Sequence, residues 1–190
     1  MRGPIWRFLC GVIGVVIGFG VVGFAEEPLV TDRPDFTESS SAVGKGVLQL
    51  ESGITFADFR NGTNVMTVGE ILARWGVADK VELRFLLPTY ARESGSGASA
   101  SGFLSTSVGL KCELSESNGS GFIGGMEAAL IAATTVPTGT GDFESSSWEP
   151  VVVLCTSWEL GPNAGIGTNV GLARPVGDEQ RYTTLWASVA

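Results

Sequence analysis

Residues 68–90, VGEILARWGVADKVELRFLLPTY, decide the fold of this chain. Apolar and polar side chains alternate on both sides of a short central break, so that Glu82 and Arg84 fall on one face and Leu83 and Phe85 on the other. A period of two is typical of a β-strand, and a break this short predicts an antiparallel hairpin. In a soluble protein the apolar face would cover a core. In a membrane barrel it would contact lipid and turn the charges toward a lumen.

The composition narrows the classes of function. The formal net charge of −8 argues against a nucleic-acid partner, which needs a basic surface. Histidine is absent, and with it the commonest general base and metal ligand. No nucleophile elbow, phosphate loop or zinc-binding spacing is present either, so we expect no enzymatic activity, no metal and no cofactor. Beyond Cys10, the remaining Cys112 and Cys155 are expected to be buried or lipid-facing thiols, with a disulfide as the alternative.

Residues 1–25 have the features of a secretory signal peptide. Arg2 and Arg7 precede an apolar run, and the small residues Gly23 and Ala25 precede the expected cleavage site. A transmembrane anchor is the alternative, because the run approaches the roughly 20 residues that a span requires. Cleavage would remove two of the 12 basic residues and none of the 20 acidic ones, which leaves a net charge of −10 on the exported chain.

Residues 26–46 are expected to form an extended N-terminal segment, in which Pro34 disfavours both a helix and a central strand. From its pattern alone, this segment could lie in a lumen, reach toward a periplasmic partner or serve as an ordinary tether.

Residues 47–190 are expected to form an all-β domain, an antiparallel up-and-down outer-membrane β-barrel. About eight stretches of about 10 residues alternate, and a tilted strand of that length spans the roughly 25 Å apolar band of an outer membrane. These stretches lie near residues 47–56, 68–77, 81–90, 104–114, 122–133, 148–158, 165–173 and 182–190. Short connections are expected at 77–80, 115–121 and 159–163, and long ones at 58–66, 92–101, 136–147 and 174–181.

Aromatic side chains near the expected strand ends fit the interfacial girdles of such a barrel. They are Trp75, Tyr90, Trp148, Trp158 and Tyr182. The alternative is a secreted soluble β-sandwich that holds these aromatics in its core.

Charged side chains on the inner face of the expected sheet are the candidates for a functional lining. They are Glu51, Glu70, Arg74, Glu82, Arg84, Lys111, Glu127 and Glu149. Charges on neighbouring strands can pair across a sheet, and a wide lumen lined with both signs would select small polar or amphipathic solutes. In an eight-stranded barrel, side chains fill the interior, and the same charges would only hold the structure together.

Several motifs, taken in order, resemble one known family. The most specific is Thr31-Asp32-Arg33-Pro34-Asp35-Phe36, continued by Thr37-Glu38-Ser39. Weaker ones are GVLQLE at 46–51, EILARWG at 70–76, VELR at 81–84, GLK at 109–111 and VPTG at 136–139. Together they resemble the family of outer-membrane transporters named after the meta-pathway (MetA-pathway) of phenol degradation, from about residue 31 to the end.

The resemblance implies a barrel in the bacterial outer membrane that moves small compounds, aromatic ones among them. Its partners would be outer-membrane lipid, the barrel-insertion machinery and an unidentified solute. Members of the family are generally longer and usually finish on an aromatic residue, whereas this chain stops at Ala190 inside an apparent strand. We therefore expect an incomplete barrel, with an unusual eight-stranded closure as the alternative. Two other functions stay open, a structural barrel without a pore and a soluble β-sandwich that binds a ligand.

Overall fold

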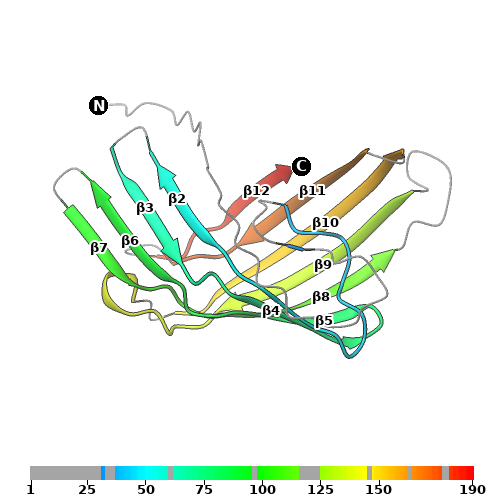
Figure 1. Ribbon diagram of the computed structural model, residues 1–190, viewed down its shortest axis with the longest axis horizontal. Coiled ribbons are helices and arrows are strands. Elements are labelled where there is room, and N and C mark those ends of the chain that lie inside the picture. The colour runs from blue at the N-terminus through cyan, green and yellow to red at the C-terminus, as the bar shows by residue number, and fades with distance from the viewer. Residues whose placement is uncertain are drawn as a thin grey trace.

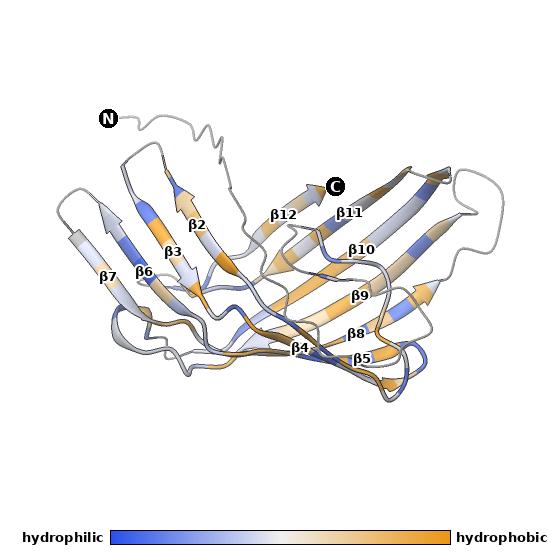
Figure 2. Cartoon of the chain, viewed as in Figure 1, coloured by the Kyte–Doolittle hydropathy of each residue, from blue (hydrophilic) through white to orange (hydrophobic). Residues whose placement is uncertain are grey.

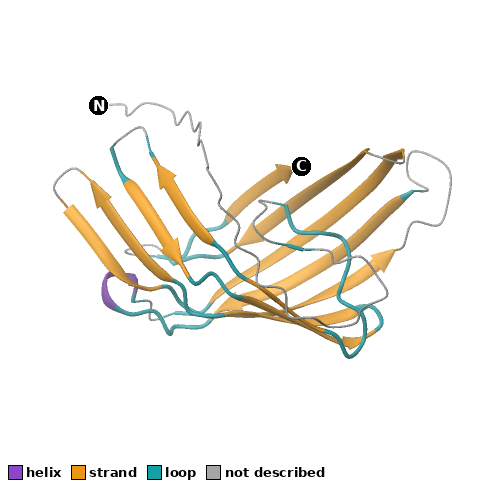
Figure 3. Cartoon of the chain, viewed as in Figure 1, coloured by secondary structure: helices purple, strands orange, loops and turns teal. Residues whose placement is uncertain are grey.

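The fold was analysed in a computed structural model that describes residues 31–32, 37–59, 62–95, 98–115, 125–144, 147–161, 164–176 and 180–190. Among these residues the chain is all-β, with one turn of 3-10 helix, η1, at Gly141–Phe143 (Figure 3). No helix in this part of the chain is long and apolar enough to cross a membrane. The expected signal peptide, residues 1–25, lies outside the described residues.

The described strands form two antiparallel sheets (Figure 1). In chain order the strands are β1 Leu48–Glu51, β2 Ile54–Asp58, β3 Asn64–Val68, β4 Leu72–Ala78, β5 Val81–Leu86, β6 Tyr90–Gly95, β7 Ala98–Phe103, β8 Ser107–Ser115, β9 Met126–Thr135, β10 Glu149–Gly161, β11 Ala164–Ala173 and β12 Thr184–Val189. The larger sheet has the order β1-β4-β5-β8-β9-β10-β11-β12, and the smaller has the order β2-β3-β6-β7. Every pairing is antiparallel, as the period-two pattern predicts.

The smaller sheet extends four strands of the larger one. Its order matches that of β1, β4, β5 and β8, because each of these strands is joined to its continuation by only two or three residues. Backbone hydrogen bonds cross the joints between neighbouring lines, from Glu70 to Gly53, from Leu87 to Ile71 and from Leu104 to Thr89. One joint coincides with Gly69, which has a φ of 76°, outside the range of a strand. We call each strand, together with its continuation where it has one, a line of the sheet. The described strands therefore form eight lines, as predicted, and four of these lines are each interrupted between two strands.

The expected connections are confirmed only in part. The tight turn at Ala78–Val81 and the long loop after β9 are both present. The expected long loop at 92–101 is wrong, because β6 and β7 run through most of it as a narrow hairpin. Small residues such as Ser99, Ala100 and Ser101 lack the alternation that marks a strand, and the pairing with β6 alone reveals it. Most of the connection at 115–121 lies outside the described residues.

The sheet is open in the structure. The order of the larger sheet begins at β1 and ends at β12, and in the described residues these two strands do not pair with each other. Figure 1 shows the strands curving into a trough, with β4 and β5 at its base. Figure 1 shows the smaller sheet continuing from the larger one, and the described residues form no second sheet stacked on the first as in a sandwich.

The two faces of this sheet have opposite character. Large apolar side chains lie exposed on the outer face, such as Trp75, Phe85 and Val152, whereas alternate positions on the inner face are buried. Figure 2 shows hydrophobic and hydrophilic residues interspersed along the same strands. The buried apolar cluster comprises Ala129, Ile131, Val153 and Cys155, all on β9 and β10. Cys112 and Cys155 are free thiols, so the alternative of a disulfide between them is wrong.

Candidate functional site

A cluster of buried charges lies on the inner face of β1, β4, β5 and β8. Register places Arg74 directly opposite Arg84, and Glu82 directly opposite both Gly76 and Lys111. Like charges directly opposite each other on neighbouring strands are destabilising. The two arginines can therefore share this face only if carboxylates lie between them.

Two of those carboxylates come from the strands themselves. Arg74 donates to Glu82 through Nε and Nη2, at 3.0 and 2.9 Å, and to Glu51 through Nη1, at 3.1 Å. Arg84 Nη1 donates to Glu82 Oε1 at 2.8 Å, and this oxygen also accepts from Arg74 Nε. Arg74, Glu82 and Lys111 are 1%, 0% and 0% exposed, so water contributes little to their solvation and their partners must replace it.

The third carboxylate is Asp32, from the N-terminal segment. Its Oδ2 accepts from Lys111 Nζ at 2.8 Å and from Arg84 Nη1, and it lies 3.5 Å from Arg74 Nη2. Its Oδ1 accepts from the backbone N–H of Ser39 at 2.8 Å. Three cations thus converge on one carboxylate, and Asp32 raises the number of acids among them from two to three.

The pKa values of the two carboxylates of the N-terminal segment, Asp32 and Glu38, are shifted in opposite directions. Burial alone would raise the pKa of Asp32, but the charges of Lys111, Arg84 and Arg74 outweigh burial and hold this pKa far below its ordinary value. Burial raises the pKa of Glu38 to about 7, against the opposing effect of Arg84. Glu38 lies at the rim of the cluster, with its side chain 33% exposed. Near neutral pH, Asp32 is therefore ionised, whereas Glu38 is near the midpoint of its titration.

Residues 37–46 cross the inner face from one edge of the larger sheet to the other. Each contact is with the next strand along: Thr37 with Ser188 of β12, Glu38 with Asn169 of β11, Ser40 with Ser157 of β10 and Glu127 of β9, Ala42 with Glu113 of β8, Val43 with Glu82 of β5, and Gly46 with Gly76 of β4. The chain then turns into β1, which pairs with β4. We call residues 37–46, together with Asp32, the strut, and its contacts reach seven strands of the larger sheet.

The backbone of the strut lies in direct contact with the backbone of the sheet at Gly76. A Cβ added to Gly76 would lie 2.0 Å from the carbonyl oxygen of Gly44, which is far inside van der Waals contact. Gly76 N–H donates to Val47 O at 2.9 Å, and Gly46 N–H donates to Gly76 O at 2.7 Å. Glycine is required at position 76 because the strut crosses directly over it.

The predicted lining residues divide into two groups. The structure brings Glu51, Arg74, Glu82, Arg84 and Lys111 together in the cluster. It places the other three predicted residues apart from it. Glu70 accepts hydrogen bonds from Thr55 and Thr67, Glu127 from Ser40 and Ser157, and Glu149 from the backbone of Val176.

Of the family motif, Thr31 is exposed and Asp32 is 1% exposed inside the cluster. The other predicted motif residues, Arg33, Pro34, Asp35 and Phe36, lie outside the described residues.

Asn169 and Glu113 are among the interior polar residues that contact the strut and that sequence reasoning missed. Asn169 is 0% exposed and, with its amide oriented to satisfy both groups, binds the backbone N–H and C=O of Glu38 at 2.7 and 3.0 Å. Glu113 accepts from the backbone N–H of Ala42 at 2.6 Å. Glu113 shares the face of Lys111 by the period of two, so its position could have been predicted, whereas Asn169 stands between glycines that obscure the pattern.

An apolar row of residues lies beside the ionic cluster on the inner face. Ile131 lies directly opposite Lys111, and the same row continues through Val153 and Gly171 to Trp186 on β12. A Cβ on Gly171 would lie 2.2 Å from the ring of Trp186, so this glycine makes room for the indole. The ionic cluster therefore borders directly on an apolar row.

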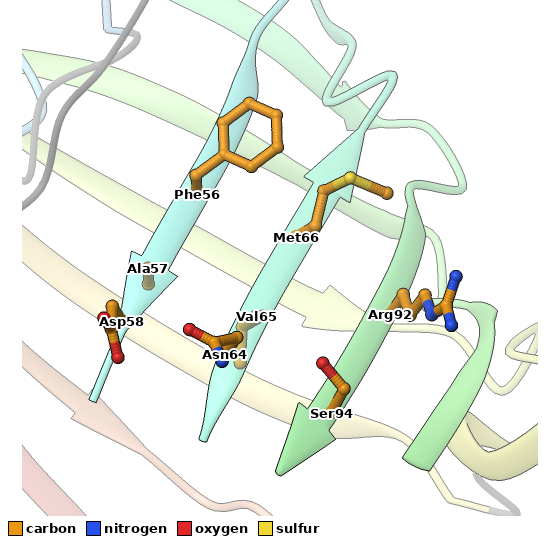
Figure 4. Close-up of a pocket in the computed structure, with 8 residues that line it drawn as sticks. All are labelled: Phe56, Ala57, Asp58, Asn64, Val65, Met66, Arg92 and Ser94. Atoms are coloured by element: carbon orange, nitrogen blue, oxygen red, sulfur yellow. The ribbon is translucent and has the colours of Figure 1, made fainter. Parts of the chain in front are cut away.

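A separate hollow of about 450 Å³ lies on the smaller sheet, at β2, β3 and β6 (Figure 4). Phe56, Met66 and Arg92 form a row of directly opposite residues, and Asp58, Asn64 and Ser94 form the next row. None of these residues belongs to the ionic cluster. The charged residues that line the hollow are Asp58 and Arg92.

A model of one protein family, described as "Putative MetA-pathway of phenol degradation", matches residues 31–190. No curated protein matches the chain, and no solved structure does. The matched range starts at the TDRPDF motif, which supplies Asp32, and includes every residue of the ionic cluster.

Proposed function

The chain belongs to the family of the MetA-pathway of phenol degradation, and from this premise we propose that it is a bacterial outer-membrane β-barrel that admits small molecules. We propose that it acts as a passage and not as an enzyme, with outer-membrane lipid and the barrel-insertion machinery as its partners. The family name associates it with phenol degradation, which makes small aromatic compounds the class of solute to test first.

One observation carries the membrane proposal: the exposed face of the strands is apolar, whereas ions are buried on the opposite face. Exposed apolar side chains occur on nearly every line of the sheet, among them Leu48, Leu50, Trp75, Phe85, Leu110, Leu130, Val152, Leu154, Val170, Leu172, Leu185 and Val189. A soluble sheet would cover such a face, because exposed apolar patches of this extent mark an interaction surface. Lipid is the partner that fits a patch that continues across so many strands.

Closure into a barrel is a further step of the proposal. In lipid, an open sheet edge leaves backbone N–H and C=O groups without partners, at a cost of several kcal/mol for each group. The outer edges of β1 and β12 are of this kind in the described residues. We propose that these edges are joined in the membrane, either to each other or through further strands.

A structural barrel without an open pore is the second candidate. It is favoured by the strut, which lies across the interior and buries the ionic cluster beneath it. Solute could pass at this level only if the strut moved. The soluble sandwich has no comparable support, because the described residues show no second layer over the apolar face.

Fractionation and conductance test these proposals. Expressed with its leader, the protein should partition with outer membranes and require detergent for extraction, and the purified protein should form discrete conductance steps in a planar bilayer. Recovery in the soluble periplasmic fraction would contradict the membrane proposal. Insertion without conductance, both in the native protein and in a variant without residues 26–46, would favour the structural barrel.

A further inference from the structure

We propose that Arg74, Arg84 and Lys111 form a binding site for the carboxylate of an amphipathic solute, and that Asp32 is its intramolecular occupant. The proposal rests on the proposed function, since it names the class of solute that the passage would take. It also makes the strut the element whose withdrawal opens the site.

The geometry around Asp32 is that of a carboxylate receptor. One oxygen receives two cationic donors, Lys111 Nζ at 2.8 Å and Arg84 Nη1, with Arg74 Nη2 at 3.5 Å. The other oxygen receives the Ser39 N–H at 2.8 Å. Charge-assisted hydrogen bonds to a carboxylate are among the strongest in proteins, and arginine is well suited to the planar group. All three cations belong to strands, whereas the carboxylate belongs to the strut.

Without Asp32, the strand residues of the cluster have an excess of positive charge. On the described strands, the carboxylates that then pair with Arg74, Arg84 and Lys111 are those of Glu82 and Glu51. A buried cation without a partner is strongly unfavourable, so the site requires an anion whenever the strut leaves. Glu38 can supply part of the negative charge from the rim of the cluster, because its carboxylate accepts from Arg84. Glu38 belongs to the strut, as Asp32 does. Withdrawal of the strut would remove both acids together.

The neighbouring apolar row gives the solute its second property. Lys111 is directly opposite Ile131, which continues to Val153, and Trp186 packs against the same cluster. A carboxylate bound at Arg84 and Lys111 would therefore have apolar side chains one strand spacing away. The site fits a small acid with an apolar body better than an inorganic anion.

Chemical rescue tests the site directly. Asp32→Ala removes a group the size of formate, so added formate should take its place. We expect a saturable rise of about 2–4 °C in the thermal midpoint of the detergent-solubilised Asp32→Ala protein. Straight-chain acids from butyrate to hexanoate should bind progressively tighter, by about fourfold for each methylene that reaches the apolar row. If the variant does not fold alone, its refolding yield should rise with formate and not with equal chloride.

Three controls make the result specific. Asp142→Ala removes an exposed carboxylate of η1 that accepts from the Ser101 N–H and lies outside the ionic cluster, and this variant should not respond to formate. Hexanamide, which lacks the charge, should not replace hexanoate. The double variant Asp32→Ala/Glu38→Gln should respond more strongly than Asp32→Ala, because the rim carboxylate can no longer compensate.

An equal response of Asp32→Ala and Asp142→Ala to formate would overturn the proposal, as would an equal response to formate and chloride. Binding that does not strengthen with chain length would overturn the amphipathic part. Because these measurements use protein in detergent, failure of the site with normal membrane insertion leaves the barrel standing. Rescue by formate in a protein that fractionates as soluble would support the carboxylate site and contradict the membrane barrel.

Discussion

The two halves of the inner face are built on different principles. Around β4, β5 and β8 it holds Arg74, Glu82 and Lys111, none more than 1% exposed, and it depends on the strut for its third carboxylate. Around β9 to β12 it holds Ile131, Val153 and Trp186, which pack with small neighbours. The apolar row packs within the sheet, although the strut also contacts polar residues of this half, whereas the ionic half takes a carboxylate from Asp32, which is remote in sequence. One sheet thus carries an apolar row formed by its own strands and an ionic cluster that includes a carboxylate from the strut.

The largest effect should come from removing a cation of the ionic half. Lys111→Met leaves Asp32 with one donor fewer inside the cluster, and we expect a loss of about 3–5 kcal/mol in the free energy of unfolding. Ile131→Val, at the directly opposite position in the apolar half, should cost only about 0.5–1.5 kcal/mol. Denaturant unfolding in detergent measures both, and Lys45→Met serves as an exposed control. Equal losses at positions 111 and 131 would mean that the two halves do not differ in this way.

The second effect concerns the outer face. Leu83→Arg places a charge among the exposed apolar side chains, and we expect a cost of about 2–4 kcal/mol and poor insertion if position 83 lies near the membrane midplane. Leu83→Ala should insert normally, because it adds no charge. Folding into liposomes, followed by protease protection, measures insertion. Insertion of Leu83→Arg as efficient as that of Leu83→Ala would show that this face does not contact lipid.

The third effect separates the strut from the sheet. Gly76→Ala places a Cβ 2.0 Å from Gly44 O, and we expect displacement of the strut at a cost of about 1–3 kcal/mol. Limited proteolysis should then cut residues 37–46 faster than in the native protein. Gly167→Ala is the matched control, because its Cβ would meet Thr37 at an ordinary 3.4 Å. Proteolysis at the same rate in both variants would argue against a close backbone crossing at Gly76.

The smallest effect should be a pH dependence of strut docking. The pKa of Glu38 is raised to about 7, so the folded state holds this proton more tightly and the contribution of Glu38 to stability falls as pH rises from about 4.5 to 7. The pKa of Asp32 is lowered, so its contribution is present above about pH 4 and is lost as pH falls further. Protease resistance of residues 37–46, followed from pH 3 to 8, should show both limbs. Glu38→Gln should flatten only the upper limb, and a profile unchanged by this substitution would contradict the assignment to Glu38.

Features that depend on residues close together in the sequence could be predicted, whereas contacts between residues far apart in the sequence could not. The period of two in residues 68–90 places Arg74, Glu82 and Arg84 on one face, because alternation is a local property of a strand. The same rule predicts the antiparallel hairpins and the exposed apolar rows. It fails for residues 92–101, where small side chains carry no alternation.

The strut could not be predicted in the same way. Asp32 and Lys111 are separated by 79 positions, and residues 37–46 have no periodicity that indicates their path across the sheet. Composition placed this segment in a lumen only as one of three alternatives. The structure shows residues 37–46 crossing the inner face of the sheet, where buried carboxylate oxygens and backbone N–H groups find the partners they require.

The most direct test of the central claim is an accessibility scan along β10 in the native membrane. Single spin labels at positions 151–155, with Cys112 and Cys155 replaced by Ser except where position 155 is itself labelled, would be probed with oxygen and with a water-soluble nickel complex. Val152 and Leu154 are 43% and 40% exposed, whereas Val153 and Cys155 are 5% and 0% exposed. The account predicts that 152 and 154 are accessible to oxygen and not to nickel, and that 153 and 155 are shielded from both. Nickel access at 152 and 154 equal to that of an exposed loop position would contradict it.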